Sequence, residues 1–288
     1  MSAGQSTAVV AGRVLVTGAT GTTGTRLVPL LVALGNEVIA ASRAGAGTAG
    51  ATGVRFNWHE PADHADAIAG VERIYLIPPS GDPQPELVML PFLKLAREAG
   101  VRRVVLHSNS PTPAGGPGTG IVHQAIPEMF GEWAVLRPTW FMQDVCGTHP
   151  YAQMIRQTGT IVTATGQARA GFIDAADIAR VASAALSDAA ALNTDLILTG
   201  PQALSFTEVA AILSKASGTA IRHEQVPRGE LGARYAQIGV AAKAAAFVTV
   251  MDSIIASGSE DRTTASVERV TGTPPRSFEA FAAAEFRL

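Results

Sequence analysis

Three glycines spaced three residues apart give the clearest chemical signal in this sequence. They stand in the loop Gly18-Ala19-Thr20-Gly21-Thr22-Thr23-Gly24, after an apolar run at residues 13–17 and before a helical pattern over residues 22–34. Gly18 would allow a tight turn, Gly21 a close backbone approach and Gly24 close helix packing. A helix start also offers free N–H groups to phosphate, and the hydroxyls of Thr20, Thr22 and Thr23 would add donors. The loop therefore predicts a dinucleotide site, with the spacing G-x-x-G-x-x-G.

The end of the second expected strand indicates which dinucleotide this would be. That strand, over residues 37–42, ends in Ala40-Ala41-Ser42-Arg43 and has no carboxylate at its tip for ribose hydroxyls. The guanidinium fork of Arg43 matches a 2′-phosphate, and Ser42 adds a hydroxyl. We therefore predict NADP(H) as the cofactor.

Strand and helix patterns alternate through the first half of the chain, which is typical of βαβ units. We expect strands at residues 13–17, 37–42, 54–57, 73–77, 101–108, 133–138, 195–198 and 221–226, and helices at 22–34, 86–99, 174–186 and 205–216. The last helix should carry a capping box of Ser205 and Glu208. The predicted class is α/β, with a Rossmann doubly wound, mainly parallel sheet and a smaller C-terminal α/β substrate region.

The cofactor domain is expected over residues 1–150, with an added strand near 195–199, and residues 151–288 should mainly bind substrate. Residues 46–53 and 111–120 are expected to be loops. The second loop follows the carboxyl end of a strand, where open α/β sheets place ligands. It could be a lid over the substrate or a solvated connection.

Composition and charge exclude several other classes. The net charge is −2 and the basic residues are scattered, so we expect no nucleic-acid partner. The single cysteine, Cys146, cannot form an internal disulfide and is expected to be a small buried residue. No apolar run is long enough for a membrane span and the N-terminus lacks a signal pattern, so we predict a cytoplasmic protein. We expect it to be a monomer or homodimer. The polar cluster His59, Glu60, Asp63 and His64 matches no metal motif, and a solvated helix start is expected there.

Longer stretches of the chain resemble one group of proteins. Residues 16–24, Val-Thr-Gly-Ala-Thr-Gly-Thr-Thr-Gly, resemble the start of an atypical short-chain dehydrogenase/reductase of the NmrA-like group. Residues 133–142, Trp-Ala-Val-Leu-Arg-Pro-Thr-Trp-Phe-Met, and residues 171–182 are similar to festuclavine and agroclavine dehydrogenases. Residues 200–210 and 271–278 match further segments of the group, so the resemblance covers nearly the whole chain.

The resemblance implies roles for residues outside the glycine loop. By it, Ile77, Pro78 and Pro79 border a cofactor ribose, Asn57 and Trp58 lie beside adenine, Pro138 and Thr139 flank the nicotinamide, and Trp140 and Phe141 face substrate. Asn57 replaces an acid common in relatives, and the two aromatic residues could instead pack in the core. Ser108 stands near the usual family serine, with Ser110 as a second possibility, and either could cap the next loop.

The usual catalytic pair of short-chain dehydrogenases is missing from the sequence. Most use Tyr-x-x-x-Lys, but none of Tyr75, Tyr151 and Tyr235 has a lysine four residues later. His123 lies in the helix expected to carry that pair. It could donate a proton, anchor the nicotinamide ribose, or have no role.

Hydride acceptors that do not need this pair remain. An iminium ion needs only hydride, and an imine, enone or quinone needs one further proton. We therefore predict an NADPH-dependent reductase of a small hydrophobic imine or iminium, enone or quinone, with secondary metabolism implied by the resemblance alone. A non-catalytic NADP(H)-sensing regulator of the NmrA type, or a non-redox isomerase or dehydratase, stays open as an alternative.

Overall fold

The apolar runs of the first half become the strands of one parallel sheet. The computed structural model describes residues 8–287. The N-terminal residues 1–7, for which the sequence predicts no signal peptide, lie outside the described residues. The strands are β1 (Arg13–Thr17), β2 (Glu37–Ser42), β3 (Thr52–Arg55), β4 (Arg73–Leu76), β5 (Arg103–His107), β6 (Glu132–Pro138) and β9 (Thr194–Leu198). They form a seven-stranded sheet in the order β3-β2-β1-β4-β5-β6-β9, and every neighbouring pair is parallel.

This strand order confirms the predicted Rossmann fold and locates its ligand edge. After β1 the chain adds β2 and β3 on one side of β1. It then crosses back to place β4 on the other side, so the direction of strand addition reverses at β1. In open parallel sheets, ligands bind beyond the carboxyl ends of the strands at such a reversal. The glycine loop follows β1 directly and therefore lies at this point.

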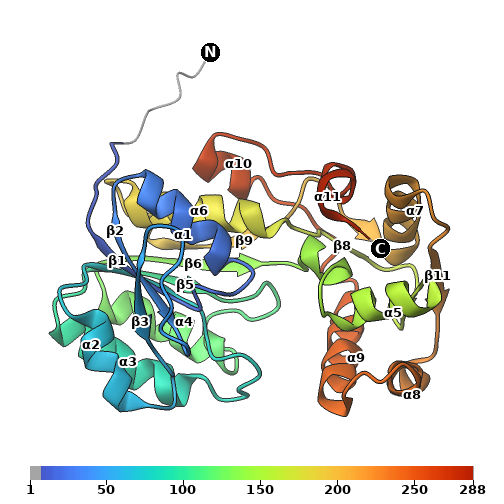
Figure 1. Ribbon diagram of the computed structural model, residues 1–288, viewed down its shortest axis with the longest axis horizontal. Helices are drawn as coiled ribbons and strands as arrows, with labels where there is room; N and C mark the ends of the chain where they lie inside the picture. The colour runs from blue at the N-terminus through green and yellow to red at the C-terminus, as the bar shows by residue number, and fades with distance from the viewer. Residues whose placement is uncertain (1–7, 288) are drawn as a thin grey trace. The chain divides into compact units, whose positions relative to one another are not determined.

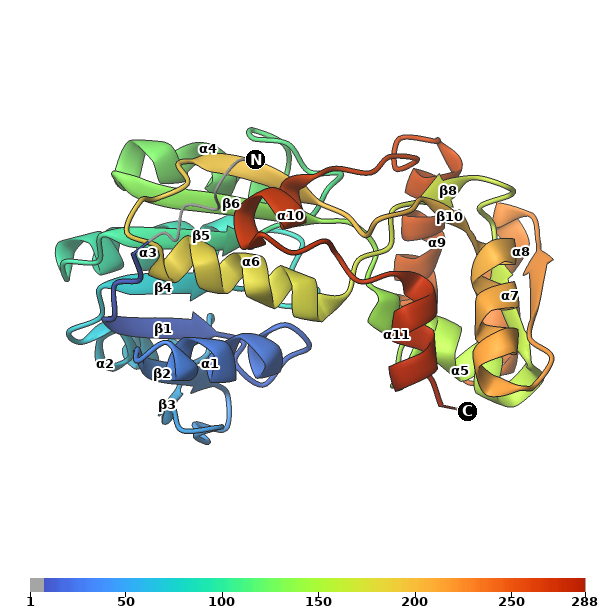
Figure 2. The ribbon, with the colours of Figure 1, turned by 90° about the horizontal axis from the view of Figure 1, so that it is seen from above.

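Helices cover both faces of the sheet (Figures 1 and 2). One face carries α1 (Gly24–Ala33), α6 (Ala175–Ser187) and α10 (Ser266–Thr271), and the other carries α2 (His64–Ile68), α3 (Glu86–Glu98) and α4 (Thr119–Met129), with the 3₁₀ turn η1 (Pro61–Asp63) before α2. Gly35, with φ +81°, follows the end of α1 in the left-handed conformation that commonly ends helices. The long segment before α4 is a loop up to Gly118, because α4 begins at Thr119.

The described residues form two compact units. The first comprises the chain up to Pro138 together with Ala175–Leu198 and Ser266–Thr273, and the second comprises Thr139–Asp174, Thr199–Ala265 and the chain from Pro274 onward. The sequence placed a division near residue 150 with one returning strand. In the structure the chain leaves the first unit at Pro138, where β6 ends. The helices α6 and α10 belong to the first unit as well as β9.

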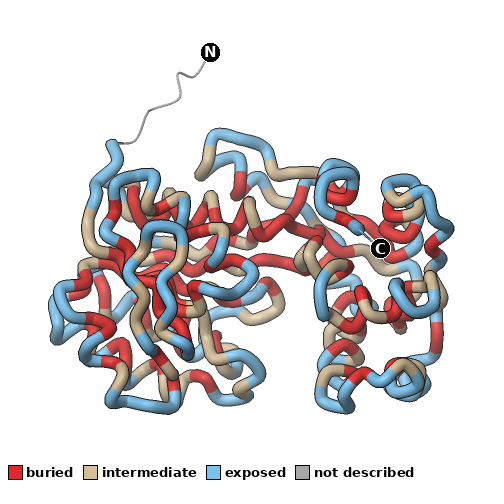
Figure 3. Tube along the Cα trace, viewed as in Figure 1, coloured by how far each residue is buried: buried red, intermediate tan, exposed pale blue. Residues whose placement is uncertain are grey.

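The second unit has its own core and small sheets. Its elements are η2 (Met142–Val145), α5 (Pro150–Thr158), β7 (Thr160–Thr163), β8 (Arg169–Ala170), β10 (Leu204–Ser205), α7 (Phe206–Ser217), β11 (Arg222–Gln225), α8 (Arg228–Gln237), α9 (Ala242–Ala256) and α11 (Phe278–Glu285). β7 pairs with β11 in parallel, and β8 pairs with β10 antiparallel. The predicted capping box of Ser205 and Glu208 starts α7. Buried segments run through the middle of each unit, with exposed turns outside (Figure 3).

Candidate functional site

The glycine loop after β1 is shaped as a phosphate site. Gly18 has φ +61°, and its carbonyl accepts a hydrogen bond of 2.9 Å from the Gly21 amide, which closes the turn. Thr20, Gly21 and Thr22 are exposed. Within residues 8–287, the backbone amides of Thr22 and Thr23 donate to no protein acceptor. These two amides at the start of α1 can therefore bind an anion.

Gly24 is required by the turn itself. A Cβ atom at this position would lie 2.7 Å from Ala19 Cα and still closer to the Gly18 carbonyl oxygen. The predicted reason was close packing of the helix on the sheet. The structure gives a nearer neighbour, because α1 packs against the Gly18–Ala19 backbone before it reaches the sheet.

The end of β2 offers the two groups predicted for a 2′-phosphate. Ser42 is buried, and its Oγ has no hydrogen-bond partner among the described residues. Arg43 is exposed and makes no hydrogen bond or ion pair within them. The loop and this strand end are adjacent, since the Ala19 amide donates to the Ala41 carbonyl at 3.2 Å. A buried hydroxyl without a partner costs free energy, so a ligand oxygen at Ser42 would stabilise it. These residues fit an NADP(H) phosphate.

The residues after β3 and β4 divide between site and core. Ile77 packs over the glycine loop: its Cβ lies 3.2 Å from where a Cβ on Gly18 would stand. Ile77, Pro78 and Pro79 are each half-buried, which leaves them able to contact a ligand. Trp58 is buried, and its Nε1 donates to the Ile77 carbonyl at 3.1 Å. Trp58 thus connects the segment after β3 to the end of β4 through this hydrogen bond. Its contact with adenine stays a prediction.

The polar cluster near Trp58 is less solvated than expected. Asn57 is half-buried and its Oδ1 accepts from the His59 amide at 3.1 Å. His64 is buried, stacks on Phe56 with ring centroids 5.0 Å apart, and has its Nε2 3.1 Å from the Asn57 carbonyl. The interpretation of a solvated helix start is therefore wrong for His64, because the ring fills an aromatic cluster. Among the described residues, no group of three His, Cys, Asp or Glu could hold a metal.

Ser108 contacts the first turn of α4, the helix that carries His123. Ser108 is buried, and its Oγ lies 3.1 Å from Thr119 Oγ1 at the start of α4. His123 follows Thr119 by four residues, so both lie on one helix face. His123 is only 5% exposed, and its Nδ1 has no partner among the described residues. Burial lowers the pKa of His123, Asp195 raises it and Arg137 lowers it. The ring is therefore neutral at pH 7 and can donate or accept one hydrogen bond.

Arg137 holds the strand ends beside His123 together. Its Nη1 pairs with Asp195 Oδ2 at 2.8 Å and its Nη2 donates to the Ser110 carbonyl at 2.7 Å. The Ser110 amide donates to the Pro138 carbonyl at 2.9 Å. Ser110 is 1% exposed, so a substrate cannot reach it in this structure.

The segment after β6 belongs to the second unit and is hydrogen-bonded to residues 171–173. Thr139 Oγ1 donates to the Gly171 carbonyl, and the Ile173 amide donates to the Trp140 carbonyl at 2.8 Å. Trp140 is buried in the core of that unit, although its Nε1 has no partner among the described residues. Phe141 is half-buried. Of the two aromatic residues, Phe141 is thus the more accessible to a substrate.

All three tyrosines are enclosed. The Tyr75 hydroxyl lies 2.7 Å from His107 Nδ1, the Tyr151 hydroxyl donates to Asp252 Oδ1 at 2.5 Å, and the Tyr235 hydroxyl donates to the Val162 carbonyl at 2.9 Å. Burial raises the pKa of each tyrosine. Burial also lowers the pKa of His107 to about 4. Sequence reasoning missed these pairs, because their members are 32 to 101 residues apart.

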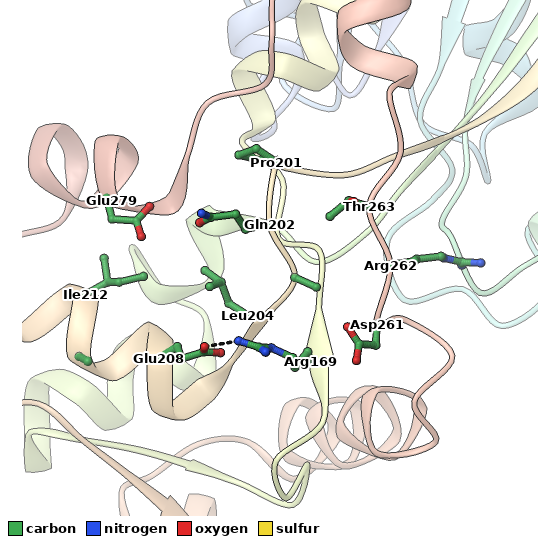
Figure 4. A pocket seen from close by; sticks show the side chains of 12 residues that line it. Arg169, Pro201, Gln202, Leu204, Glu208, Ile212, Asp261, Arg262, Thr263 and Glu279 are labelled. Carbon is green, nitrogen blue, oxygen red and sulfur yellow. Dashed lines mark hydrogen bonds and ion pairs between the residues drawn. The ribbon is translucent and has the colours of Figure 1, made fainter.

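A separate pocket of about 860 Å³ lies within the second unit. Its lining includes Arg169, Gln202, Glu208, Asp261 and Glu279, and Arg169 pairs with Glu208 (Figure 4). Arg262 points away from the other lining side chains. None of the residues predicted for cofactor or substrate lines this pocket.

Sequence comparison finds relatives that match most of the chain. The model of the NmrA-like family matches residues 124–281. The uncharacterized oxidoreductase YesF of Bacillus subtilis is 43% identical over 94% of each chain. Agroclavine dehydrogenase of Claviceps fusiformis is 35% identical over 78% of this chain and 81% of its own. The predicted family resemblance and the oxidoreductase class are thereby confirmed.

Solved structures support the same architecture. The NADPH-dependent quinone oxidoreductase of Escherichia coli, complexed with NADPH, has a TM-score of 0.81 and covers 94% of this chain and 98% of its own. The two chains are 20% identical, so this likeness concerns the fold. Along residues 8–287, no helix has the length and apolar character needed to cross a membrane.

Proposed function

The chain belongs to the NmrA-like family, and we propose that it is an NADPH-dependent reductase of a small hydrophobic imine or iminium ion, enone or quinone. One observation carries the proposal: among the described residues, Ser42 Oγ and the Arg43 guanidinium have no partner, and they lie next to a glycine loop in which the Thr22 and Thr23 amides donate to no protein acceptor. NADPH, when bound, would supply hydride. The remaining contributions come from the side chains of the protein.

The cofactor would be held by groups at the carboxyl ends of neighbouring strands. The amides of Thr22 and Thr23 would bind the pyrophosphate, and Ser42 with Arg43 would bind the 2′-phosphate. Ile77 would cover the ribose beside Gly18. An Arg–phosphate contact favours NADPH over NADH because NADH has no 2′-phosphate.

The state of His123 favours anchoring over proton donation. Because burial lowers its pKa, little imidazolium is present at pH 7. A neutral ring with an unpartnered Nδ1 can instead hydrogen-bond the nicotinamide ribose. Ser108 would position α4 through Thr119, and Pro138 with Thr139 would flank the nicotinamide.

The enclosed tyrosines favour acceptors that need little acid assistance. A buried tyrosine with a raised pKa and an occupied hydroxyl is a poor proton relay. Iminium ions, quinones and activated alkenes accept hydride at an electron-poor atom. The relative that is 35% identical carries the name agroclavine dehydrogenase, which supports hydride transfer as the reaction type. Phe141 would contact the apolar body of the acceptor.

The cellular setting and the assembly state are further parts of the proposal. We expect the protein to act on small molecules in the cytoplasm, as a monomer or homodimer without nucleic acid. The net charge of −2 and the scattered basic residues support the last point.

An acceptor screen tests the proposed function. Purified protein is mixed with NADPH or NADH and with menadione, cyclohexenone, dihydroisoquinoline or N-methyldihydroisoquinolinium. We expect acceptor-dependent oxidation of NADPH with at least one compound, and a kcat/KM at least roughly tenfold lower with NADH. Tight NADPH binding without oxidation by any acceptor would instead support the sensing regulator.

A further inference from the structure

A tight turn carries Arg43 out of the sheet. The Gly45 amide donates to the Ser42 carbonyl at 3.1 Å, which closes a four-residue turn with Arg43 in its second position. The same carbonyl accepts from the Phe56 amide, just after β3, at 2.9 Å. Gly45 has φ +68°, a left-handed conformation that favours glycine. The backbone around Arg43 is therefore fixed on both sides, although its side chain is exposed.

The loop after this turn rests on a glycine of β3. Gly53 pairs with Ala40 of β2, and β3 is the edge strand of the sheet (Figure 2). A Cβ atom on Gly53 would overlap both the Gly45 carbonyl oxygen and the Gly47 amide nitrogen. Both atoms belong to the backbone, which cannot turn aside as the end of a side chain can. Residues 45–47 therefore cross β3 at a distance that glycine permits and alanine does not.

The packing is equally close from the side of the loop. A Cβ atom on Gly47 would lie 2.8 Å from the Ala51 carbonyl oxygen and 3.2 Å from the Gly53 amide nitrogen. A Cβ atom on Gly45 would lie 3.2 Å from the Arg55 amide nitrogen. Because little space remains on any side, a displacement of this loop must be taken up by the turn before it or by the edge strand beneath it.

We propose that Gly53 is a positioning residue for NADPH selectivity, because it seats the loop that holds Arg43 at the 2′-phosphate. This inference rests on the proposed function, in which Ser42 and Arg43 bind that phosphate. One residue, Ala44, separates Arg43 from Gly45, so a backbone shift at Gly45 moves Arg43 as well. A guanidinium binds phosphate through two parallel hydrogen bonds, and such a site must be held within about 0.5 Å. A fixed turn also reduces the entropy that Arg43 loses on binding.

Gly53→Ala tests this role through the dissociation constants of NADPH and NADH, measured without any acceptor. The added methyl group should displace residues 45–47 and, with them, Arg43. We expect NADPH binding to weaken roughly fivefold or more and NADH binding to stay within roughly twofold. Gly45→Ala is a second variant, should Gly53→Ala fail to fold. Its φ of +68° strains alanine in the turn itself, so it should lower the preference for NADPH in the same direction.

A double substitution and a control separate positioning from general destabilisation. If Gly53 acts through Arg43, then Gly53→Ala should weaken NADPH binding by no more than roughly twofold when Arg43 is already alanine. Gly70→Ala is the matched control, because Gly70 has φ +68° in the turn before β4, at the opposite ends of the strands from the ligand edge. It should lower Tm and leave the preference for NADPH unchanged.

The other possible results contradict the inference or its premise. A lower Tm in Gly53→Ala with an unchanged preference for NADPH would overturn the inference, since it would mean that β3 yields and the turn does not. A loss of NADPH affinity as large in the Arg43→Ala background as in wild type would overturn it too. If wild type shows no preference for NADPH, or Arg43→Ala does not reduce it, the proposed phosphate site is overturned together with the role of Gly53.

Discussion

Ser108 Oγ and Thr119 Oγ1 lie 3.1 Å apart, and this contact joins the end of β5 to the start of α4. His123 stands one helical turn beyond Thr119 on the same face of the helix. The position of the histidine ring therefore depends on a hydroxyl pair that does not include it.

This relationship predicts matched effects of two substitutions. Ser108→Ala and Thr119→Val each remove one half of the pair, and losing a buried hydrogen-bond partner costs about 1–3 kcal/mol. If Ser108 acts by positioning α4, both variants should show similar losses of kcat/KM and of Tm. A much larger kcat loss in Ser108→Ala would mean that its hydroxyl touches the reacting groups.

His123 gives a prediction about pH. Because burial lowers its pKa, the neutral ring should dominate above its ordinary pKa of about 6.5. With N-methyldihydroisoquinolinium as acceptor, kcat/KM should stay level from about pH 7 to about pH 9 in wild type. His123→Ala should weaken NADPH binding and rate, and His123→Gln, which keeps a donor, should recover part of both. Activity that falls as pH rises, and does so only while His123 is present, would identify the ring as a proton donor.

Gly24 predicts a steric requirement. Gly24→Ala places a methyl group 2.7 Å from Ala19 Cα, and overpacking against backbone typically costs about 1–3 kcal/mol. We expect a lower Tm and weaker NADPH binding. Gly131→Ala is the control, since a Cβ there meets nothing within 4 Å and should change neither. An unaffected Gly24→Ala would show that the loop differs from the one described.

Asp252 predicts how stability changes with pH. Burial raises its pKa from 3.8 to about 6, although hydrogen bonds from Tyr151 and the Ala164 amide oppose the rise. The folded state thus holds this proton more tightly than the unfolded state, so the contribution is present below pH 3.8 and is lost as pH rises through about 6. The free energy of unfolding lost over this pH range amounts to about 3 kcal/mol.

Denaturant unfolding from about pH 4 to about pH 8 measures this contribution. Wild type should lose unfolding free energy relative to Asp252→Asn across that range. Tyr151→Phe removes the hydroxyl but keeps the ring, so it should raise the pKa of Asp252 further and move the loss to higher pH. Parallel curves for wild type and Asp252→Asn would contradict the assignment.

Local signals explain why the first unit could be predicted well. Most of its strands are short apolar runs, and glycines such as Gly35 mark helix ends. The exception is β3, whose residues Thr52–Arg55 are polar or small apart from Val54, and which was predicted two residues too late, at 54–57. The capping box of Ser205 and Glu208 likewise acts within four residues. Such features depend on the chain itself, so the parallel sheet and the glycine loop follow from the sequence.

Contacts between distant residues explain what was missed. Tyr151 and Asp252 are 101 residues apart, and nothing in either neighbourhood indicates the other. The half-buried position of Asp144 depends on η2 docking against Ile173, which no periodic pattern signals. The burial of Trp140, left open between core and substrate, was likewise decided by packing in the second unit.

The preference for NADPH over NADH in Arg43→Ala tests the central claim most directly. Dissociation constants for both nucleotides are measured in wild type, in Arg43→Ala and in Arg55→Ala, a control on the neighbouring strand with its own partner Asp63 at 3.3 Å. A bidentate charged contact is worth about 1.5–3 kcal/mol, so Arg43→Ala should weaken NADPH binding roughly tenfold or more and leave NADH binding nearly unchanged. Arg55→Ala should change neither. Equal weakening of both nucleotides by Arg43→Ala, or no weakening of either, would contradict the assignment of this strand end to the 2′-phosphate.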